Sequence, residues 1–411
     1  MGKKIKEIEG GVCAPQGFRA GAISCGIKNP AVERLDLALI YSDFPTVGAA
    51  VYTQNQVRAA PVQLSSSYLK NADPRAIIVN SGNANACTGH QGMIHARAMA
   101  AGASKALGLK QREIQVCSTG IIGVPLPIER IEPRMADLVA SLGTDGEPPA
   151  RAIMTSDTRP KSVAVSVKID GIKIRIGAIA KGAGMINPHM ATMLCFVTTD
   201  AAVSKAEITS ATREAVEHSF NRISVDGDMS TNDTVIVMAN GQAGNRVVTR
   251  GGIGSAEFRR ALNHVMLTLA KKIVSDGERV TKLVEVQVRG AASALDAERV
   301  ARAVSNSKLV KCSWNGNDPN WGRVIHAIGY SGARIKEEMV DIYFGGVLAA
   351  QNGLAAKTDL ESLSAAVREP EFTVGIDLNQ GTGNYTIYST DLSPEYVEFN
   401  RQEYAINRQT K

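Results

Sequence analysis

The chain has 411 residues, of which 44% are hydrophobic and 21% charged, as expected for a globular protein of about two or three domains. Its formal net charge of +6 comes from lysines and arginines that are scattered along the sequence, and only 5% of the residues are aromatic. Nucleic-acid binding requires a clustered basic surface and often uses stacking rings, so it is not predicted.

No apolar run has the length of a transmembrane helix, and the basic residues 1–7 are not followed by the apolar core of a signal peptide. We therefore expect no membrane span and a cytoplasmic location. The six cysteines and six histidines are dispersed, without a Cys-x-x-Cys pair or another metal-ligand spacing. This pattern predicts free, buried thiols and no metal site. We also expect no cofactor.

Strand and helix patterns alternate along the chain. In order, we expect a strand at 75–80, a helix at 91–108, a strand at 114–117, a hairpin at 163–176, a strand at 193–197, helices at 204–220 and 255–274, a strand at 280–288, a helix beyond 290, and strands at 338–344, 372–378 and 384–390. The hairpin is the clearest element, because apolar residues alternate on both sides of Asp170-Gly171, a pair typical of tight turns. Paired strands interleaved with helices favour mixed β-sheets covered by helices over a doubly wound parallel sheet.

The glycine-rich loops do not match the common phosphate-binding motifs. The segment Gly251–Gly254 lacks the preceding buried strand and the spacing of a dinucleotide-binding loop, and no glycine loop ends in Gly-Lys-Ser or Gly-Lys-Thr. A Gly-x-Ser-x-Gly nucleophile elbow is also absent from the sequence. Nicotinamide, kinase and serine-hydrolase chemistries are therefore poorly supported.

The most informative segment is Lys181–Phe196, in which a glycine-containing loop runs into an apolar stretch. Thr192 stands at the junction. If the Ala191–Thr192 bond is cut, Thr192 gains a free α-amine beside its own hydroxyl, which is the base and nucleophile pair of amine-activated threonine enzymes. A threonine that opens a strand is ordinarily a β-branched residue in its preferred place, so the spacing alone does not decide.

Several segments together resemble the ornithine acetyltransferase family, also called the bifunctional glutamate N-acetyltransferases of arginine biosynthesis. The resemblance covers nearly the whole chain. Besides Lys181–Phe196, it rests on the segments Gly17–Gly21, Ala59–Val62, Asn80–Gly89, Ser118–Gly123, Ile223–Asp228, Ser275–Glu278, Asn317–Arg323 and Asp391–Val397. Each segment is short, but their common order along the chain makes coincidence improbable.

The resemblance implies an enzyme that cuts itself between Ala191 and Thr192, giving an α chain of residues 1–191 and a β chain of residues 192–411. It implies ping-pong transfer of an acetyl group from N-acetylornithine to glutamate through an ester of Thr192, with acetyl-CoA as a further candidate substrate. The expected fold is an αββα-like sandwich of about residues 1–288, followed by a smaller α/β domain of about residues 289–411. The expected assembly contains two α and two β chains.

The resemblance also assigns site residues. Thr119 and Gly120 match the oxyanion-binding positions, although a Thr-Gly pair after a strand would otherwise be interpreted as a turn. Thr155 and Lys181 match substrate-binding positions, and a lysine is a sensible partner for a substrate carboxylate. Glu278 matches an acidic residue suited to the ammonium end of ornithine; its alternative is a solvated residue at a helix end.

The C-terminus departs from the family pattern. Family members commonly carry an asparagine followed five residues later by threonine or serine, both closing over the substrate. Asn400 matches this asparagine, but Ala405 occupies the later position. Thr410 is the remaining candidate, and it would require a looped-out tail.

Two other functions remain open at this point. A self-processing amidase or aminopeptidase would share the nucleophile and pass the acyl group to water. A non-catalytic relative would keep the fold as an amino-acid-binding or assembly protein, although the retained Thr119, Gly120, Lys181 and Glu278 argue against it. The same half-reactions could also serve another acceptor in a specialised pathway.

Overall fold

The computed structural model describes residues 5–187 and 193–409, with the backbone alone for residues 402–409. These residues form two units. The first comprises residues 5–182, 193–221 and 229–273, and the second comprises residues 183–187, 222–228 and 274–409. The last change of unit falls after Ile273, before strand β11 (Leu283–Ala291), which pairs with two strands of the second unit.

The first unit contains a six-stranded sheet in the order β1-β7-β8-β9-β10-β4. Its strands are β1 (Lys6–Ile8), β4 (Val47–Tyr52), β7 (Lys161–Ile169), β8 (Ile172–Lys181), β9 (Leu194–Thr199) and β10 (Thr234–Ala239). The predicted hairpin is confirmed as β7 and β8, and both residues of its turn, Asp170 and Gly171, have positive φ angles. Strands β9 and β10 are parallel, while the other neighbours are antiparallel.

A four-stranded sheet in the order β2-β3-β5-β6 completes the strands of the first unit. Its strands are β2 (Phe18–Ile23), β3 (Leu37–Ser42), β5 (Ala76–Asn80) and β6 (Ile114–Ser118). Strands β5 and β6 are parallel, and the long helix α2 (Gly89–Leu107) connects them. The predicted strands at 75–80 and 114–117 and the predicted helix at 91–108 are thereby confirmed.

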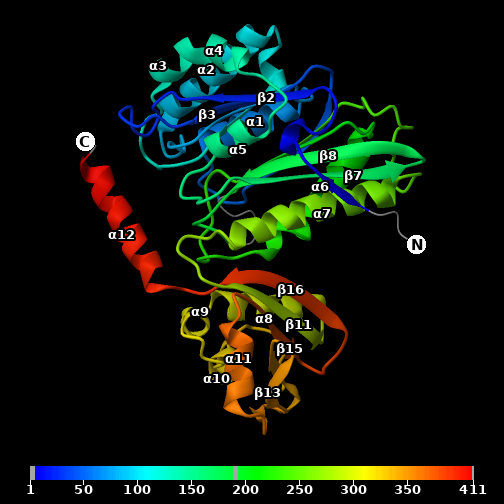
Figure 1. The fold of residues 1–411 in the computed structure, drawn as a ribbon, viewed down its shortest axis with the longest axis vertical. Coiled ribbons are helices and arrows are strands. Elements are labelled where there is room, and N and C mark those ends of the chain that lie inside the picture. The colour runs from blue at the N-terminus through cyan, green and yellow to red at the C-terminus, as the bar shows by residue number, and fades with distance from the viewer. Residues whose placement is uncertain (1–4, 188–192, 410–411) are drawn as a thin grey trace. The chain divides into compact units, whose positions relative to one another are not determined.

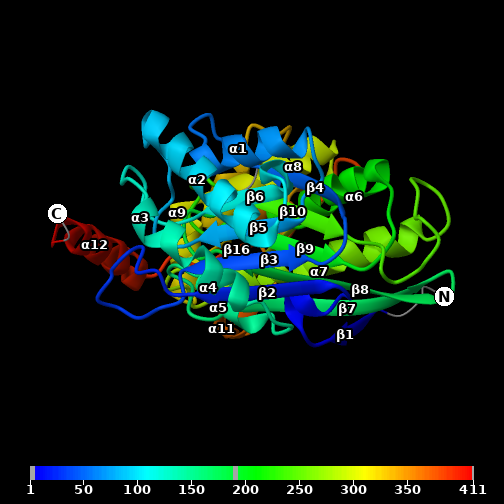
Figure 2. The ribbon, with the colours of Figure 1, turned by 90° about the horizontal axis from the view of Figure 1, so that it is seen from above.

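The two sheets of the first unit pack face to face, with helices on their outer faces (Figures 1 and 2). Strand β3 is apolar on both faces, as a strand between two apolar layers must be. Ala38 and Ile40 join the core between the sheets, whereas Leu37 and Leu39 pack against helices on the other face. The helices on that outer face are α1 (Ala60–Leu69), α2, α3 (Ile128–Ile131) and α4 (Met135–Ala140). The other sheet is covered by α6 (Lys205–Glu217) and α7 (Ser255–Val274), and α5 (Glu147–Ala152) joins the inter-sheet core. The αββα layering is confirmed.

The second unit contains one mixed sheet in the order β14-β13-β12-β15-β11-β16. Besides β11, its strands are β12 (Asp341–Phe344), β13 (Val347–Gln351), β14 (Leu354–Ala355), β15 (Glu371–Asp377) and β16 (Gly383–Thr390). Its helices are α8 (Ala294–Asn306), α9 (Lys308–Asn315), α10 (Trp321–Gly329), α11 (Leu360–Arg368) and α12 (Pro394–Gln409).

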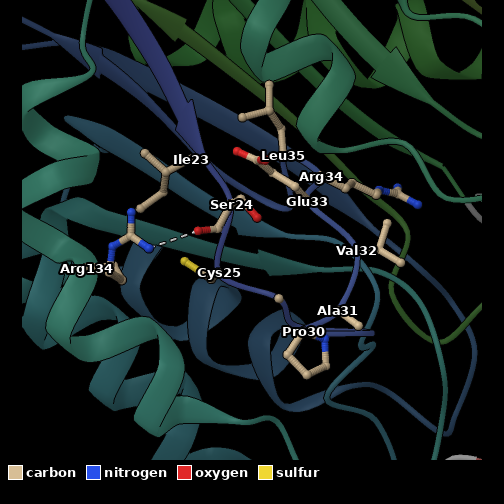
Figure 3. Close-up of a pocket in the computed structure, with 11 residues that line it drawn as sticks. Ile23, Ser24, Cys25, Pro30, Ala31, Val32, Glu33, Arg34, Leu35 and Arg134 are labelled. Carbon is tan, nitrogen blue, oxygen red and sulfur yellow. Dashed lines mark hydrogen bonds between the residues drawn. The ribbon is translucent and has the colours of Figure 1, made fainter.

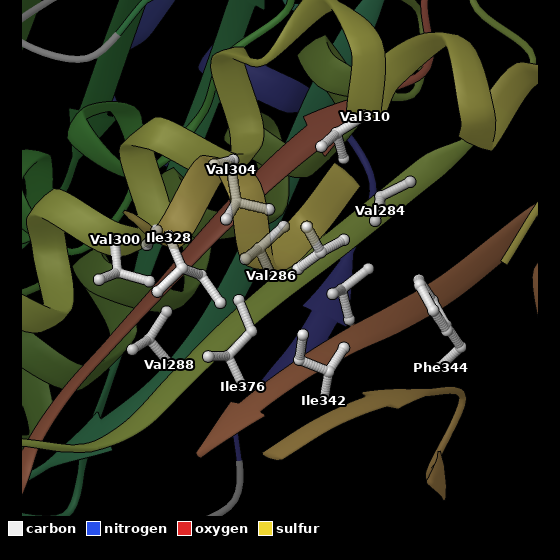
Figure 4. Packing of buried hydrophobic residues seen from close by; sticks show 14 of the residues in the cluster. Val284, Val286, Val288, Val300, Val304, Val310, Ile328, Ile342, Phe344 and Ile376 are labelled. Carbon is white, nitrogen blue, oxygen red and sulfur yellow. The ribbon is translucent and has the colours of Figure 1, made fainter. Parts of the chain in front are cut away.

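The second unit has its own hydrophobic core (Figure 4). Val284, Val286 and Val288 occupy alternate positions of β11, and each is 1% exposed or less. Apolar residues of α8, such as Val300 and Val304, belong to the same core and pack against these strand residues. This period-two burial is what the alternating sequence of residues 280–288 predicts. The smaller C-terminal α/β domain is therefore present. Within the part of the chain that the structure describes, no helix combines the length and the apolar character needed to cross a membrane.

Candidate active site

The predicted nucleophile segment connects two paired strands of the first unit. Strand β8 ends at Lys181, and β9 returns antiparallel to it, with Lys181 opposite Leu194. Residues 182–193 join the two strands. Ala191 and Thr192 lie in this connection but outside the described residues, so the site is defined here by the residues that surround the connection.

Thr119 follows the end of β6 in the facing sheet. Its backbone N–H donates to Asn80 O at 3.0 Å, and the Ser118 hydroxyl donates to Asn80 Oδ1 at 2.6 Å. These bonds hold the Thr119 turn against the turn that follows β5, where Asn83 forms an isolated bridge to Thr119. The Thr119 side chain is buried, with 3% exposure.

Gly120 needs to be glycine for two independent reasons. Its φ angle is +138°, which residues with a Cβ rarely adopt, and an added Cβ would lie 2.3 Å from Gly82 C and 2.4 Å from Asn83 N. Its N–H has no hydrogen-bond acceptor among residues 5–187 and 193–409. The turn therefore presents one backbone donor beside the Thr119 hydroxyl.

The Lys181 ammonium brings three of the predicted residues together. It donates to Thr155 Oγ1 at 2.7 Å and to Thr119 Oγ1 at 3.4 Å, and the Lys181 side chain is only 2% exposed. Because the Thr119 oxygen accepts from the ammonium, its O–H is available to donate in another direction. The lysine and the two threonine hydroxyls thus form one polar cluster at the end of β8.

Two charged residues that the sequence did not single out complete this cluster. Asp157 Oδ1 accepts from Lys161 Nζ at 2.6 Å and from the Gly182 N–H at 2.8 Å, while Oδ2 accepts from the Thr155 N–H at 3.0 Å. Burial disfavours ionisation of Asp157, but Lys181 and Lys161 outweigh it and hold its pKa at about 2. Asp157 is therefore a buried carboxylate that ties together the backbone on both sides of the cluster.

Asn232 and Asp233, which precede β10, form a second group that the sequence analysis missed. The Asn232 side-chain amide donates to Ala84 O at 2.7 Å and to Ser118 O at 2.8 Å, so it fixes the turns after β5 and β6. Asp233 Oδ1 accepts from the Met193 N–H at 3.0 Å, and burial raises the Asp233 pKa well above its usual range. The signal in the sequence was four consecutive polar residues, 230–233, directly before a buried strand.

In the second unit, the predicted residues Glu278 and Asn400 lie together. Asn400 Nδ2 donates to Glu278 Oε2 at 3.1 Å, although Asn400 itself is exposed. The Glu278 N–H donates to Ala183 O at 3.0 Å, and a Cβ on Gly184 would lie 2.4 to 2.5 Å from the Glu278 carboxylate. The glutamate therefore packs directly on the glycine loop that follows Lys181. Thr410 lies outside the described residues.

Asp226 holds the next part of the same loop. Its carboxylate accepts from the Met185 N–H at 2.6 Å and the Ile186 N–H at 2.9 Å, and the Tyr396 hydroxyl donates to it at 3.3 Å. Burial raises the pKa of Asp226, and its backbone hydrogen bonds act against that shift. The loop before the predicted cleavage point is thus fixed by backbone hydrogen bonds within the second unit.

The first unit also has a cavity of about 730 Å³, and none of the candidate site residues described above lines it (Figure 3). It lies between Arg134 and the loop of residues 23–35, where Arg134 Nη1 donates to Ser24 O at 3.1 Å. Asp36 fixes the loop by accepting from the Cys25 and Ile27 N–H groups at 2.6 and 2.7 Å. Among the described residues, no group of three or more His, Cys, Asp or Glu side chains is arranged to hold a metal ion.

The fold and the clusters define a layered αββα protein with a candidate acyl-transfer site at the end of β8. Comparison with known proteins agrees with the resemblance seen in the sequence. The profile of the ArgJ family matches residues 19–405, so the chain belongs to the ArgJ family.

Its relatives are named arginine biosynthesis bifunctional protein ArgJ. That of Geobacter sulfurreducens is 51% identical over 387 residues, which are 94% of this chain and 98% of the relative. That of Symbiobacterium thermophilum is 46% identical over 394 residues, covering 96% and 98%. The solved ornithine acetyltransferase of Mycobacterium tuberculosis, complexed with ornithine, is 40% identical; the match covers 45% of this chain and 98% of that chain, with a TM-score of 0.42.

Proposed function

We propose that this protein transfers the acetyl group of N2-acetyl-L-ornithine to L-glutamate, giving L-ornithine and N-acetyl-L-glutamate. In the proposal, the chain first cuts its own Ala191–Thr192 bond, and Thr192 then carries the acetyl group as an ester. The names of its relatives in the ArgJ family support the reaction, and the chemistry below supports the route.

The observation that carries the proposal is the contact of Lys181 Nζ with both Thr155 Oγ1 and Thr119 Oγ1, at 2.7 and 3.4 Å. These residues come from three separate segments of the sequence, and the family resemblance assigns each of them to the site. A buried ammonium beside two hydroxyls suits an anionic group, either a substrate carboxylate or a developing oxyanion.

Self-cleavage begins with attack of the Thr192 hydroxyl oxygen on the carbonyl carbon of Ala191. The tetrahedral intermediate collapses as the bond between the Ala191 carbonyl carbon and the Thr192 nitrogen breaks, and the nitrogen, which stays on Thr192, takes up the proton of the hydroxyl. This leaves an ester that water hydrolyses. The products are a carboxylate on Ala191 and a free α-amine on Thr192. Before cleavage this nitrogen is an amide and cannot accept a proton, whereas the amine has a reference pKa of about 8.

Acetyl transfer then uses the new amine as the general base. It accepts the proton of the Thr192 hydroxyl while the oxygen attacks the acetyl carbon, and it returns the proton to the departing amine of ornithine. In the second half-reaction the glutamate amine attacks the ester, and the Thr192 oxygen leaves and regains a proton that the α-amine takes from the attacking amine. Both steps pass through an oxyanion, and we assign its stabilisation to the Thr119 O–H and the Gly120 N–H, each contributing about 3 to 4 kcal/mol.

The substrate's own charges are assigned to Lys181 and Glu278. The ammonium of Lys181 pairs with the α-carboxylate that both substrates carry, with Thr155 as its hydrogen-bond partner. The carboxylate of Glu278, supported by Asn400, pairs with the side-chain ammonium of ornithine. Because Thr192 itself holds the acetyl group, the proposed reaction needs no cofactor. We further propose an α2β2 assembly in the cytoplasm.

Intact mass spectrometry tests the cleavage and the nucleophile together. We expect the purified protein to give two fragments divided at residue 192, and incubation with N-acetylornithine to add one acetyl group to the later fragment. Addition of glutamate should remove that group as N-acetylglutamate, and acetyl-CoA is tested as donor in a parallel reaction. Thr192→Ala should remain uncut and unacetylated.

Three results would contradict the proposal. A persistent single chain would exclude the self-cleavage, and an acetyl group on another residue would exclude the nucleophile. Release of acetate to water, with no dependence on glutamate, would identify an amidase of the same general chemistry. Thr192→Ser serves as the matched control, because it keeps a hydroxyl nucleophile and should still be cut.

A further inference from the structure

The candidate site contains a buried lysine for which the proposed reaction has no use. Lys161 stands at the start of β7, and its side chain is 1% exposed. It pairs with Asp157, whose side chain is 0% exposed, and the Lys181 side chain beside them is 2% exposed. Two ammonium groups and one carboxylate give this cluster a net charge of +1. Burial raises the pKa of the neighbouring Asp233 carboxyl well above its usual range, so this group is less readily ionised than a surface aspartate.

The two lysines do not share the carboxylate equally. Lys161 Nζ lies 2.6 Å from Asp157 Oδ1, the distance of a close ion pair. Lys181 Nζ lies 3.9 Å from Asp157 Oδ2 and only 2.7 Å from Thr155 Oγ1. Lys161, which has no role in the proposed reaction, therefore forms the close ion pair with Asp157. Lys181, which binds the substrate in the proposed reaction, remains hydrogen-bonded to the threonine hydroxyls.

Electrostatics explains why this division matters. Attraction between charges is strong in a buried environment and rises as they approach. If Asp157 had Lys181 as its only cationic partner, the ammonium would be drawn toward the carboxylate and away from the threonine hydroxyls. Lys161 satisfies Asp157 instead, so that the excess positive charge of the cluster remains on Lys181.

We infer that Lys161 and Asp157 are positioning residues that hold the Lys181 ammonium against Thr119 and Thr155, where it receives the anionic group of the substrate. Neither residue touches the substrate. Asp157 also fixes the backbone at Thr155 and Gly182, so it sets the position of both partners of the contact. The inference deepens the proposed function and rests on it for the role of Lys181.

The test compares Lys161→Met, Asp157→Asn and the double variant, because their cluster charges differ. The wild type has +1, Lys161→Met has zero, Asp157→Asn has +2, and the double variant returns to +1. In Lys161→Met we expect the KM for both N-acetylornithine and glutamate to rise about tenfold or more, with a smaller change in kcat, because a charge-assisted contact is lost. The double variant should recover to within about threefold of the wild type, whereas independent structural defects would add.

Two further variants separate charge from folding. Lys161→Arg keeps the cation and should retain most of the activity, even if Lys161→Met folds poorly. Lys205→Met is the matched control, since Lys205 also pairs with an aspartate, Asp73, at 2.6 Å in the first unit, but is half exposed. It should leave both KM values unchanged. All variants are compared after mass spectrometry has established the extent of cleavage.

A measurement without substrate tests the inference independently of the reaction. Lysine-selective NMR, with Lys181→Arg for assignment, gives the pKa of the Lys181 ammonium. We expect this pKa to rise by about one unit or more in Lys161→Met, to fall in Asp157→Asn, and to return in the double variant. An unchanged pKa, or additive losses in the double variant, would overturn the inference. Absence of acetyl transfer in the wild type would instead overturn the proposed function.

Discussion

At the scale of single residues, Thr119 carries the most specific expectation. Its hydroxyl accepts from Lys181 and can donate to an oxyanion, so Thr119→Val removes both interactions at nearly constant volume. We expect kcat for acetyl transfer to fall about 100- to 1000-fold, the usual loss for one oxyanion donor. Thr119→Ser keeps the hydroxyl and should stay within about tenfold of the wild type. Steady-state kinetics with both substrates distinguishes these outcomes, and equal losses in the two variants would contradict the role of the hydroxyl.

Asp157 makes the stability of the first unit depend on acid. Its pKa is about 2 in the folded chain and near 3.8 as an unperturbed group, so its stabilising contribution is complete above about pH 4. The contribution is lost as the pH falls through the folded pKa. Urea unfolding between pH 6 and pH 2 should therefore show a loss of about 2 to 3 kcal/mol in the wild type that Asp157→Asn lacks.

A surface ion pair provides the control for this acid dependence. Asp43 pairs with Arg19 at 2.6 Å, but their side chains are 36% and 41% exposed. Asp43→Asn should change the free energy of unfolding by less than about 1 kcal/mol. The loss of stability between pH 6 and pH 2 should be the same in this variant as in the wild type. If Asp157→Asn behaved like Asp43→Asn, the buried cluster would not be held by charge.

At the scale of elements, Lys282 fixes the end of α11 in the second unit. Its ammonium donates to the carbonyl oxygens of Val367, Arg368 and Glu369 at 2.8, 2.9 and 3.2 Å, and to Asn317 Oδ1 at 2.7 Å. The last carbonyls of a helix have no partner within it, so a lysine here satisfies several of them at once. Lys282→Met should lower the free energy of unfolding of this unit by about 2 to 4 kcal/mol.

The opposite end of the same helix supplies the comparison. Asp359 caps α11 by accepting from the Ser362 N–H at 2.8 Å, and Asp359→Ala should cost about 1 kcal/mol. Tryptophan fluorescence can follow both variants, because Trp314 and Trp321, the two tryptophans of the chain, belong to the second unit. A smaller effect for Lys282→Met than for Asp359→Ala would show that water replaces the lysine.

The elements were predictable where local pattern and burial agree. The β7–β8 hairpin, α2, α7 and β16 were found because alternation, helical spacing or turn residues mark them. Strands β2, β3, β4 and β10 were missed. Their burial depends on neighbours far away in the sequence, as with β10 between β9 and β4. The expectation of buried thiols was largely wrong, since only Cys117 and Cys195 are buried.

The candidate site was predictable in part. Short family motifs indicated its residues, whereas hydrophobic periodicity, which indicated the strands and helices, did not. Lys181, Thr119 and Thr155 were assigned from family segments and do meet. Asp157 and Lys161 are only four residues apart and were overlooked because their importance lies in the contacts of Asp157 with Lys181 and the Gly182 N–H, more than twenty residues further along the chain. Asn232 belongs to the same class, since its amide bridges two turns more than a hundred residues away in the chain.

At the scale of the whole molecule, the proposed cleavage would cut a chain whose two parts share one sheet. Strands β1, β4, β7 and β8 precede residue 192, and β9 and β10 follow it. The order β1-β7-β8-β9-β10-β4 places the two later strands between earlier ones on both sides. Six residue pairs join β8 to β9, and six more join β10 to β4.

We therefore expect the two fragments to remain associated after cleavage. Separating them would break both ladders and expose the core between the sheets, at a cost comparable to unfolding the first unit. Gel filtration under native conditions should give one peak containing both fragments in equal amounts, while denaturing electrophoresis separates them. Uncut Thr192→Ala should elute at the same volume. Native dissociation of the fragments would mean that this sheet does not survive the cut, and the site at the end of β8 would be lost with it.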